Sequence, residues 1–150
     1  MNKIPKLQKL DLTGRGSLLG SIGPTGLKRL AQQLVNGSCM QEVWLNTSGL
    51  EGIAGGEAVA ELVDRIPGLE KIHLSGNDRL GAAGVLCFSR ALSKGCKLKS
   101  IGLAGMHMDG SSLCALLKSI PGLEMLDLSC GVPVHSDWCA GSHIATNVLQ

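Results

Sequence analysis

A single spacing of apolar residues recurs along most of this chain and constrains its fold more than any other feature. Each copy reads apolar, two variable residues, apolar, one variable residue, apolar. The copies are Leu7-Leu10-Leu12, Met40-Val43-Leu45, Leu69-Ile72-Leu74, Leu98-Ile101-Leu103 and Leu123-Leu126-Leu128. Successive copies begin 33, 29, 29 and 25 residues apart. This period predicts stacked units, each too small to bury its own apolar face.

A second pattern follows each of the first four strand-like copies. Four residues after Gly26, Gly55, Gly84 and Asp109 come an apolar residue, a small residue and, at i+4, another apolar residue. The instances are Leu30-Ala31-Leu34, Val59-Ala60-Val63, Phe88-Ser89-Leu92 and Leu113-Cys114-Leu117. The spacing predicts one apolar stripe of a helix packed closely on a flat surface. Proline in the repeated IPGLE junctions, at 66–70 and 120–124, ends the preceding helix, so each unit is strand, loop, helix and short turn.

These units resemble leucine-rich repeats of the ribonuclease-inhibitor-like subclass. The best match is LEKIHLSGN at 69–77, followed by LGAAGVLCFSRAL at 80–92, and the resemblance covers roughly residues 4–131. It implies an α/β fold: a leucine-rich-repeat solenoid of about four to five repeats over residues 1–131, a short horseshoe with a parallel sheet on the concave face and helices on the convex face. Residues 132–150 break the pattern and are expected to form a non-repeat tail or an irregular cap.

Four of the five turns after the predicted strands depart from the repeat consensus. The consensus asparagine is present only as Asn77, and the equivalent positions hold Arg15, Ser48, Met106 and Gly131. Because methionine cannot make the side-chain amide hydrogen bonds of asparagine, we expect a looser turn at Met106.

Composition narrows the class of protein. Hydrophobic residues make up 44% of the chain and aromatic residues only 2%, which suits a thin core of leucine and isoleucine rows. A net charge of +2 is too small to favour nucleic acid, and no long apolar run predicts a membrane span. The absence of a secretory signal and six scattered cysteines favour reduced thiols and a cytoplasmic location. Uncovered strand edges at the two ends would allow self-association.

Alternate residues of each strand point away from the core and define the predicted partner-binding surface. Trp44 is central because tryptophan is enriched in binding hot spots, and its neighbours on adjacent strands should be Asp11 and His73. The predicted set is Trp44, Asp11, Glu42, Asn46, Lys71 and His73. Its mixed charges favour a protein partner. Alternatively, Trp44 only covers the aliphatic stems of its neighbours.

Signals for catalysis and for cofactors are weak. No recognised nucleophile context or phosphate-binding loop is present, so neither an enzyme nor a cofactor is expected. Cys87 and Cys114 adjoin apolar helix positions and are predicted to be inert core thiols. A low-probability zinc set, with the ligand types of a closed structural site but no C-x2-C pair, comprises Cys130, His135, Cys139 and His143.

The resemblance implies a non-catalytic protein–protein interaction module that acts through its concave strand face. It is similar to the leucine-rich regions of cytosolic nucleotide-binding innate-immune receptors, which suggests recognition or scaffolding. The alternative is a GTPase-activating or other enzyme-regulating leucine-rich repeat protein. Arrays of that family are longer and are followed by an acidic tract.

Overall fold

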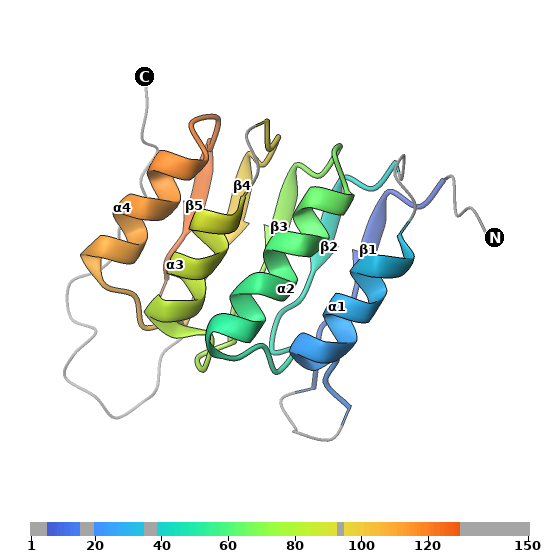
Figure 1. Ribbon diagram of the computed structural model, residues 1–150, viewed down its shortest axis with the longest axis horizontal. Coiled ribbons are helices and arrows are strands. Elements are labelled where there is room, and N and C mark those ends of the chain that lie inside the picture. The colour runs from blue at the N-terminus through green and yellow to red at the C-terminus, as the bar shows by residue number, and fades with distance from the viewer. Residues whose placement is uncertain (1–5, 16–19, 35–38, 93–94, 130–150) are drawn as a thin grey trace.

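A computed structural model describes residues 6–15, 20–34, 39–92 and 95–129 of the chain. Within these residues, short strands alternate with helices along the sequence. The elements are β1 (Lys9–Asp11), α1 (Gly23–Gln33), β2 (Glu42–Trp44), α2 (Gly52–Arg65), β3 (Lys71–His73), α3 (Gly81–Ala91), β4 (Ser100–Gly102), α4 (Gly110–Ser119) and β5 (Met125–Asp127). The strands form one parallel sheet in the order β1-β2-β3-β4-β5. The helices lie side by side on one face of it (Figure 1). The opposite surface of the sheet is called the helix-free face below.

The register of the sheet follows the apolar repeat. Val43 pairs with Leu10 on one side and Ile72 on the other, and Trp44 pairs with Asp11 and His73 as predicted. Directly before each of the strands β1 to β4, one backbone carbonyl accepts two amides of the next unit. The acceptors are Gln8, Gln41, Glu70 and Lys99. Each unit therefore adds the same pair of hydrogen bonds to its predecessor.

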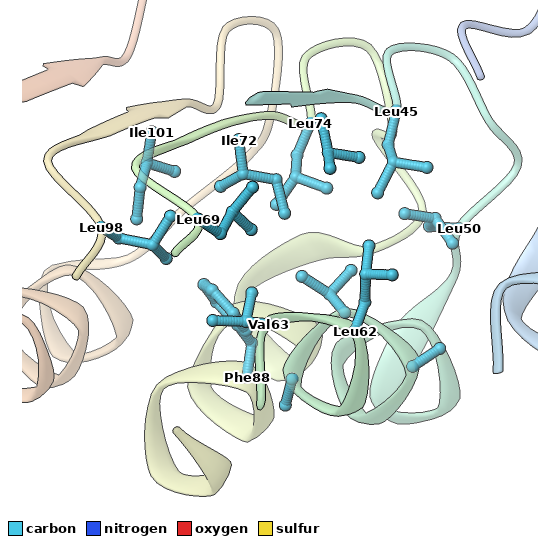
Figure 2. Packing of buried hydrophobic residues seen from close by; sticks show 14 of the residues in the cluster. Leu45, Leu50, Leu62, Val63, Leu69, Ile72, Leu74, Phe88, Leu98 and Ile101 are labelled. Atoms are coloured by element: carbon cyan, nitrogen blue, oxygen red, sulfur yellow. The ribbon is translucent and has the colours of Figure 1, made fainter. Parts of the chain in front are cut away.

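The core lies between the sheet and the helices. Leucine and isoleucine side chains from the strand segments point toward Leu62, Val63 and Phe88 of the helices (Figure 2). Phe88 is 1% exposed and is among the largest fully buried side chains. Burial of such rows across neighbouring units supplies the stability that no single unit has alone.

Glycine allows α2 and α3 to approach each other closely. A Cβ on Gly56 would overlap the backbone carbonyl oxygen of Gly84, and a Cβ on Gly84 would lie 2.6 Å from the carbonyl oxygen of Gly52. Both helices also begin with a glycine in the left-handed region, with φ of +49° at Gly52 and +56° at Gly81. Side chains at these positions would force the helices apart or strain the turn.

Two side chains secure the turns that follow β2 and β3. The Asn77 Nδ2 donates to the carbonyls of Leu45 and Leu74, at 2.8 and 2.7 Å, and Oδ1 accepts from the amide of Leu50 at 3.2 Å. At the equivalent position, the Ser48 hydroxyl donates a hydrogen bond to the carbonyl of Leu12 at 2.8 Å. Ser48 thus donates to the backbone of the preceding unit as Asn77 does, but it does not reproduce the acceptor role of the asparagine side chain. The looser turn at Met106 stays a prediction.

The predicted apolar stripe of α4 is wrong. Ser112 and Leu116 are the buried residues of this helix, whereas Leu113 is half-buried and Leu117 is 46% exposed. Asp109 is the N-cap of α4 and accepts a hydrogen bond from the Ser112 amide at 2.8 Å. Asp109 occupies the N-cap position, which in α3 belongs to Leu80, so it is not the counterpart of Gly84. Aligning the two by sequence shifted the expected stripe.

The two predicted core thiols differ in exposure. Cys87 is half-buried in α3, but Cys114 is exposed on α4, so the prediction of a core thiol is wrong for Cys114. The wrong prediction for Cys114 has the same origin as the wrong stripe of α4, namely the sequence alignment of Asp109 with Gly84.

Several expectations fall on residues 130–150, which lie outside the described part of the chain. They include the non-repeat tail and the zinc set Cys130, His135, Cys139 and His143. Among the described residues, no cluster of three or more metal-ligating side chains occurs. In that same part of the chain, no helix has both the length and the apolar character needed to cross a bilayer.

Candidate protein-binding surface

The six predicted binding residues lie on three neighbouring strands of the helix-free face or directly beyond them. Asp11 belongs to β1, Glu42 and Trp44 to β2, and Lys71 and His73 to β3, while Asn46 follows β2 by two residues. Three of them form one contact group, together with a residue that the predicted set omitted. We call Lys9, Glu42, Trp44 and His73 the Trp44 cluster.

Trp44 is held in place by partners on both neighbouring strands. Its indole Nε1 donates to Glu42 Oε1 at 2.7 Å, and the His73 Nε2 lies 3.2 Å from the same oxygen. The ring centroids of Trp44 and His73 are 4.3 Å apart, with the planes tilted by 30°. From β1, the Lys9 Nζ lies 4.2 Å from the indole centroid, a cation–π contact. The half-buried indole is thus ordered before any partner arrives.

Gly102 on β4 leaves room for the His73 ring. A Cβ at this position would lie 3.4 Å from His73 Nδ1 and 3.3 Å from the Ser75 hydroxyl oxygen. Gly102 is not among the binding residues predicted from the sequence. Its register position beside His73 was the available signal, because a missing side chain next to a large ring indicates packing space.

The remaining predicted residues have different roles. The Asn46 Oδ1 accepts from the Ser75 amide at 2.9 Å, so Asn46 supports the next unit of the sheet. Asp11 is exposed, and hydrogen bonds from the side chain and the backbone of Thr13 lower its pKa. Lys71 is exposed and forms no ion pair with a described residue. Asp11 and Lys71 therefore border the Trp44 cluster.

The pKa of the Glu42 carboxyl is lowered, first of all because the indole N–H of Trp44 bonds to its ionised form. This hydrogen bond therefore contributes stability above the unfolded-state pKa, and the contribution is lost as the pH falls through the folded-state pKa. In a Trp44→Phe variant we expect the Glu42 pKa to move upward, because phenylalanine keeps a ring but lacks the donor. Carboxyl carbon NMR titration measures both values. An unchanged Glu42 titration in Trp44→Phe would show that the indole hydrogen bond is not formed in solution.

Comparisons with known proteins support the repeat character of the chain. No model of a known protein family matches it. The mouse protein described as "NACHT, LRR and PYD domains-containing protein 12" is 31% identical over 124 residues. This alignment covers 79% of the present chain and 11% of that relative, so the chain spans about a tenth of the relative's length. At this level the similarity supports a region like the leucine-rich repeats of that protein.

A solved structure supports the same architecture. The structure described as "Structure of Chaetomium Mex67:Mtr2 subunits" aligns with a TM-score of 0.60 and 20% sequence identity. The alignment covers 82% of each chain. It shows a common α/β fold and carries no information about activity.

Proposed function

We propose that this chain is a leucine-rich-repeat solenoid of the ribonuclease-inhibitor-like subclass that binds a partner protein through its helix-free, concave face. In this proposal the solenoid comprises residues 1–131, the module is non-catalytic, and it acts in the cytoplasm. The observation that carries the proposal is the Trp44 cluster, an ordered tryptophan on the sheet surface that no helix of the described residues covers.

An ordered indole on an open surface is well suited to binding. A partner that covers the rest of Trp44 gains the burial of a large aromatic side chain. Because Glu42, His73 and Lys9 already restrain the ring, little side-chain freedom is lost on association. The core of the domain does not require this residue, since the apolar rows lie on the other face of the sheet.

The comparisons agree with an interaction module. The name of the mouse relative includes leucine-rich repeats, and the structural neighbour shares the α/β fold. A role in innate immunity, suggested by the resemblance to receptors of this type, is part of the proposal. Carboxylates and ammonium groups alternate over β1 to β3, which favours a protein surface over a phosphate backbone.

Trp44→Ala is expected to weaken binding of the partner by about 2 kcal/mol or more. Affinity capture from native cell lysate, followed by mass spectrometry, first identifies the proteins retained by the intact chain. Isothermal titration calorimetry with the purified partner then measures the change in affinity.

A matched control lies on the helical side of the molecule. Ile53 of α2 is 59% exposed, and Ile53→Ala should leave the affinity unchanged. Circular dichroism should show that both variants remain folded. Equal affinities for the intact chain and for folded Trp44→Ala would contradict the proposed role of the helix-free face.

A further inference from the structure

The hydroxyl of Ser100 is a buried polar group without a hydrogen bond. Ser100 lies on β4 and is 9% exposed. The other four buried polar side chains of the described residues each form a side-chain hydrogen bond, whereas Ser100 forms none with a described residue. Because its neighbour Ile101 points into the core, Ser100 points to the helix-free face. A buried hydroxyl without a partner costs free energy, and a hydrogen-bonding group supplied by another protein would remove that cost.

Gly102 provides space next to this hydroxyl on the same face. Its register neighbours are His73 of β3 and Asp127 of β5. A Cβ on Gly102 would lie 3.4 Å from His73 Nδ1, so this nitrogen borders the position where a side chain is missing. Ser100 and Asp127 lie on adjacent strands and are offset by two residues, so their Cα atoms are about 8 Å apart by strand spacing. We call Ser100, Gly102, His73 and Asp127 the Gly102 site.

The polar groups of the Gly102 site can all accept hydrogen bonds. The His73 Nε2 lies 3.2 Å from Glu42 Oε1. Because an ionised carboxylate only accepts, Nε2 carries the hydrogen of the neutral ring, and Nδ1 is left as an acceptor. The Asp127 carboxylate accepts from the Ser129 amide at 2.9 Å, and its second oxygen has no donor among the described residues. The site therefore suits a ligand group with several hydrogen-bond donors.

Charge on the helix-free face favours a cation at the same place. Lys9 lies close to Asp11 and Glu42, whose pKa values are lowered by hydrogen bonds and, in addition, by its positive charge. Asp127 forms no ion pair with a described residue, and its register neighbour on β4 is Gly102. Of the three carboxylates on the strands, that of Asp127 is the one with no lysine on its own strand or beside it in the described register.

We propose that a short segment of the partner places an arginine side chain at the Gly102 site, with its guanidinium hydrogen-bonded to Asp127 and Ser100. This inference depends on the proposed function and names the side chain by which the partner is recognised. A guanidinium is planar and has five N–H donors, so it can reach acceptors on different sides, including His73 Nδ1. The ammonium group of lysine is a compact point charge and matches separated acceptors less well. A carboxylate at this place would be repelled by Asp127.

The surroundings of the Gly102 site can accommodate the rest of such a segment. Met125 is 62% exposed, precedes Asp127 by two residues on the same face and can contact the methylene groups of the arginine. Trp44 lies on β2, two strands from β4 and about 10 Å away by strand spacing, so one short segment can contact both places. Lys71 is exposed and lies beside Glu42 in the register, so its ammonium group can turn away from the bound cation.

A library of random dodecapeptides, displayed on phage and selected against the full chain, tests the proposal. We expect enrichment of peptides that combine arginine with large apolar residues. In a fluorescence anisotropy titration, Asp127→Asn should bind these peptides about tenfold more weakly, because asparagine can still accept from the Ser129 amide but lacks the charge. Replacing the arginine of the peptide with lysine should weaken binding by a similar factor. Ser100→Ala should weaken it about threefold.

Asp11→Asn is the matched control on the same face. Asp11 occupies the same strand position as Asp127, and its carboxylate likewise accepts from the amide two residues further on, that of Thr13 at 3.0 Å. The substitution removes the same charge, yet the affinity should stay within about twofold. Lys71→Gln removes a positive charge and should strengthen binding of the arginine peptides about twofold, so weaker binding would contradict a cation at the site. Circular dichroism should show that all variants remain folded.

The outcomes separate this inference from the proposed function. Peptides that need Trp44 but contain no arginine, or that tolerate Asp127→Asn, would overturn the inference and leave the proposed function intact. Equal losses in Asp11→Asn and Asp127→Asn would also overturn it, because they would reflect only the overall charge of the face. Peptides that tolerate Trp44→Ala would count against the proposed function itself. Failure to enrich any peptide would overturn the recognition of an arginine within a short segment.

Discussion

Asn77→Leu is expected to lower the free energy of unfolding by about 4 kcal/mol, because three buried backbone groups lose a partner and each costs about 1–3 kcal/mol. Asn77 is only 3% exposed. Its side chain bonds the carbonyls of Leu45 and Leu74 and the amide of Leu50. Leucine has a similar size but cannot replace these bonds. Urea unfolding followed by circular dichroism measures the loss.

A control for this substitution exists at the equivalent position one unit further along. Met106 is half-buried, packs against the core and has no side-chain amide to offer the turn. Met106→Leu should therefore change the stability by less than about 1.5 kcal/mol. If Asn77→Leu were as mild as Met106→Leu, the side-chain hydrogen bonds of Asn77 would not be a main support of these turns.

Gly56→Ala is expected to lower the free energy of unfolding by about 3 kcal/mol through overpacking of α2 against α3. The added methyl group would overlap the carbonyl oxygen of Gly84 and lie 3.2 Å from the Cβ of Cys87. Backbone atoms cannot move aside as the end of a flexible side chain can, so the two helices must separate. The gain in helix propensity, about 1 kcal/mol, offsets only part of this cost.

Gly110→Ala provides the comparison for Gly56→Ala. Gly110 is the first residue of α4, and a Cβ there would have no neighbour within 4 Å. Alanine at this position should be neutral or should stabilise the chain by about 0.5–1 kcal/mol. The thermal unfolding temperatures of the two variants should therefore shift in different directions or by clearly different amounts. A loss of stability in Gly110→Ala as large as that in Gly56→Ala would indicate a general effect of removing glycine, without a specific close approach.

The arrangement of the sheet could be predicted from the sequence because the repeat determines which residues are equivalent. Once Leu45 and Leu74 are recognised as the last apolar residues of their copies, Trp44 must lie beside His73, as it does. The buried stripe Val59, Ala60 and Val63 of α2 follows from the same alignment. The helix or strand propensities of single residues matter little here, because the position of a residue in the repeat already predicts its element.

Predictions failed where the repeat changes length or where side-chain contacts decide the outcome. The last step of the repeat is 25 residues long, shorter than the others, so the alignment of α4 with α3 was ambiguous and the wrong face was expected to be buried. The donor role of Ser48 was missed, although a small hydroxyl at the position of Asn77 was visible. The sharing of Glu42 between Trp44 and His73 depends on rotamers that spacing does not specify.

Packing in this fold involves neighbouring units only, and this affects how such a protein can evolve. Among the described residues, each helix lies close to no helix other than its neighbours in the array, and each strand to no strand other than its neighbours. A duplicated or deleted unit thus needs new complementarity only at its two junctions, and all other packing is inherited. The Trp44 cluster occupies three consecutive strands, so it can be passed on as one block while the array around it lengthens or shortens.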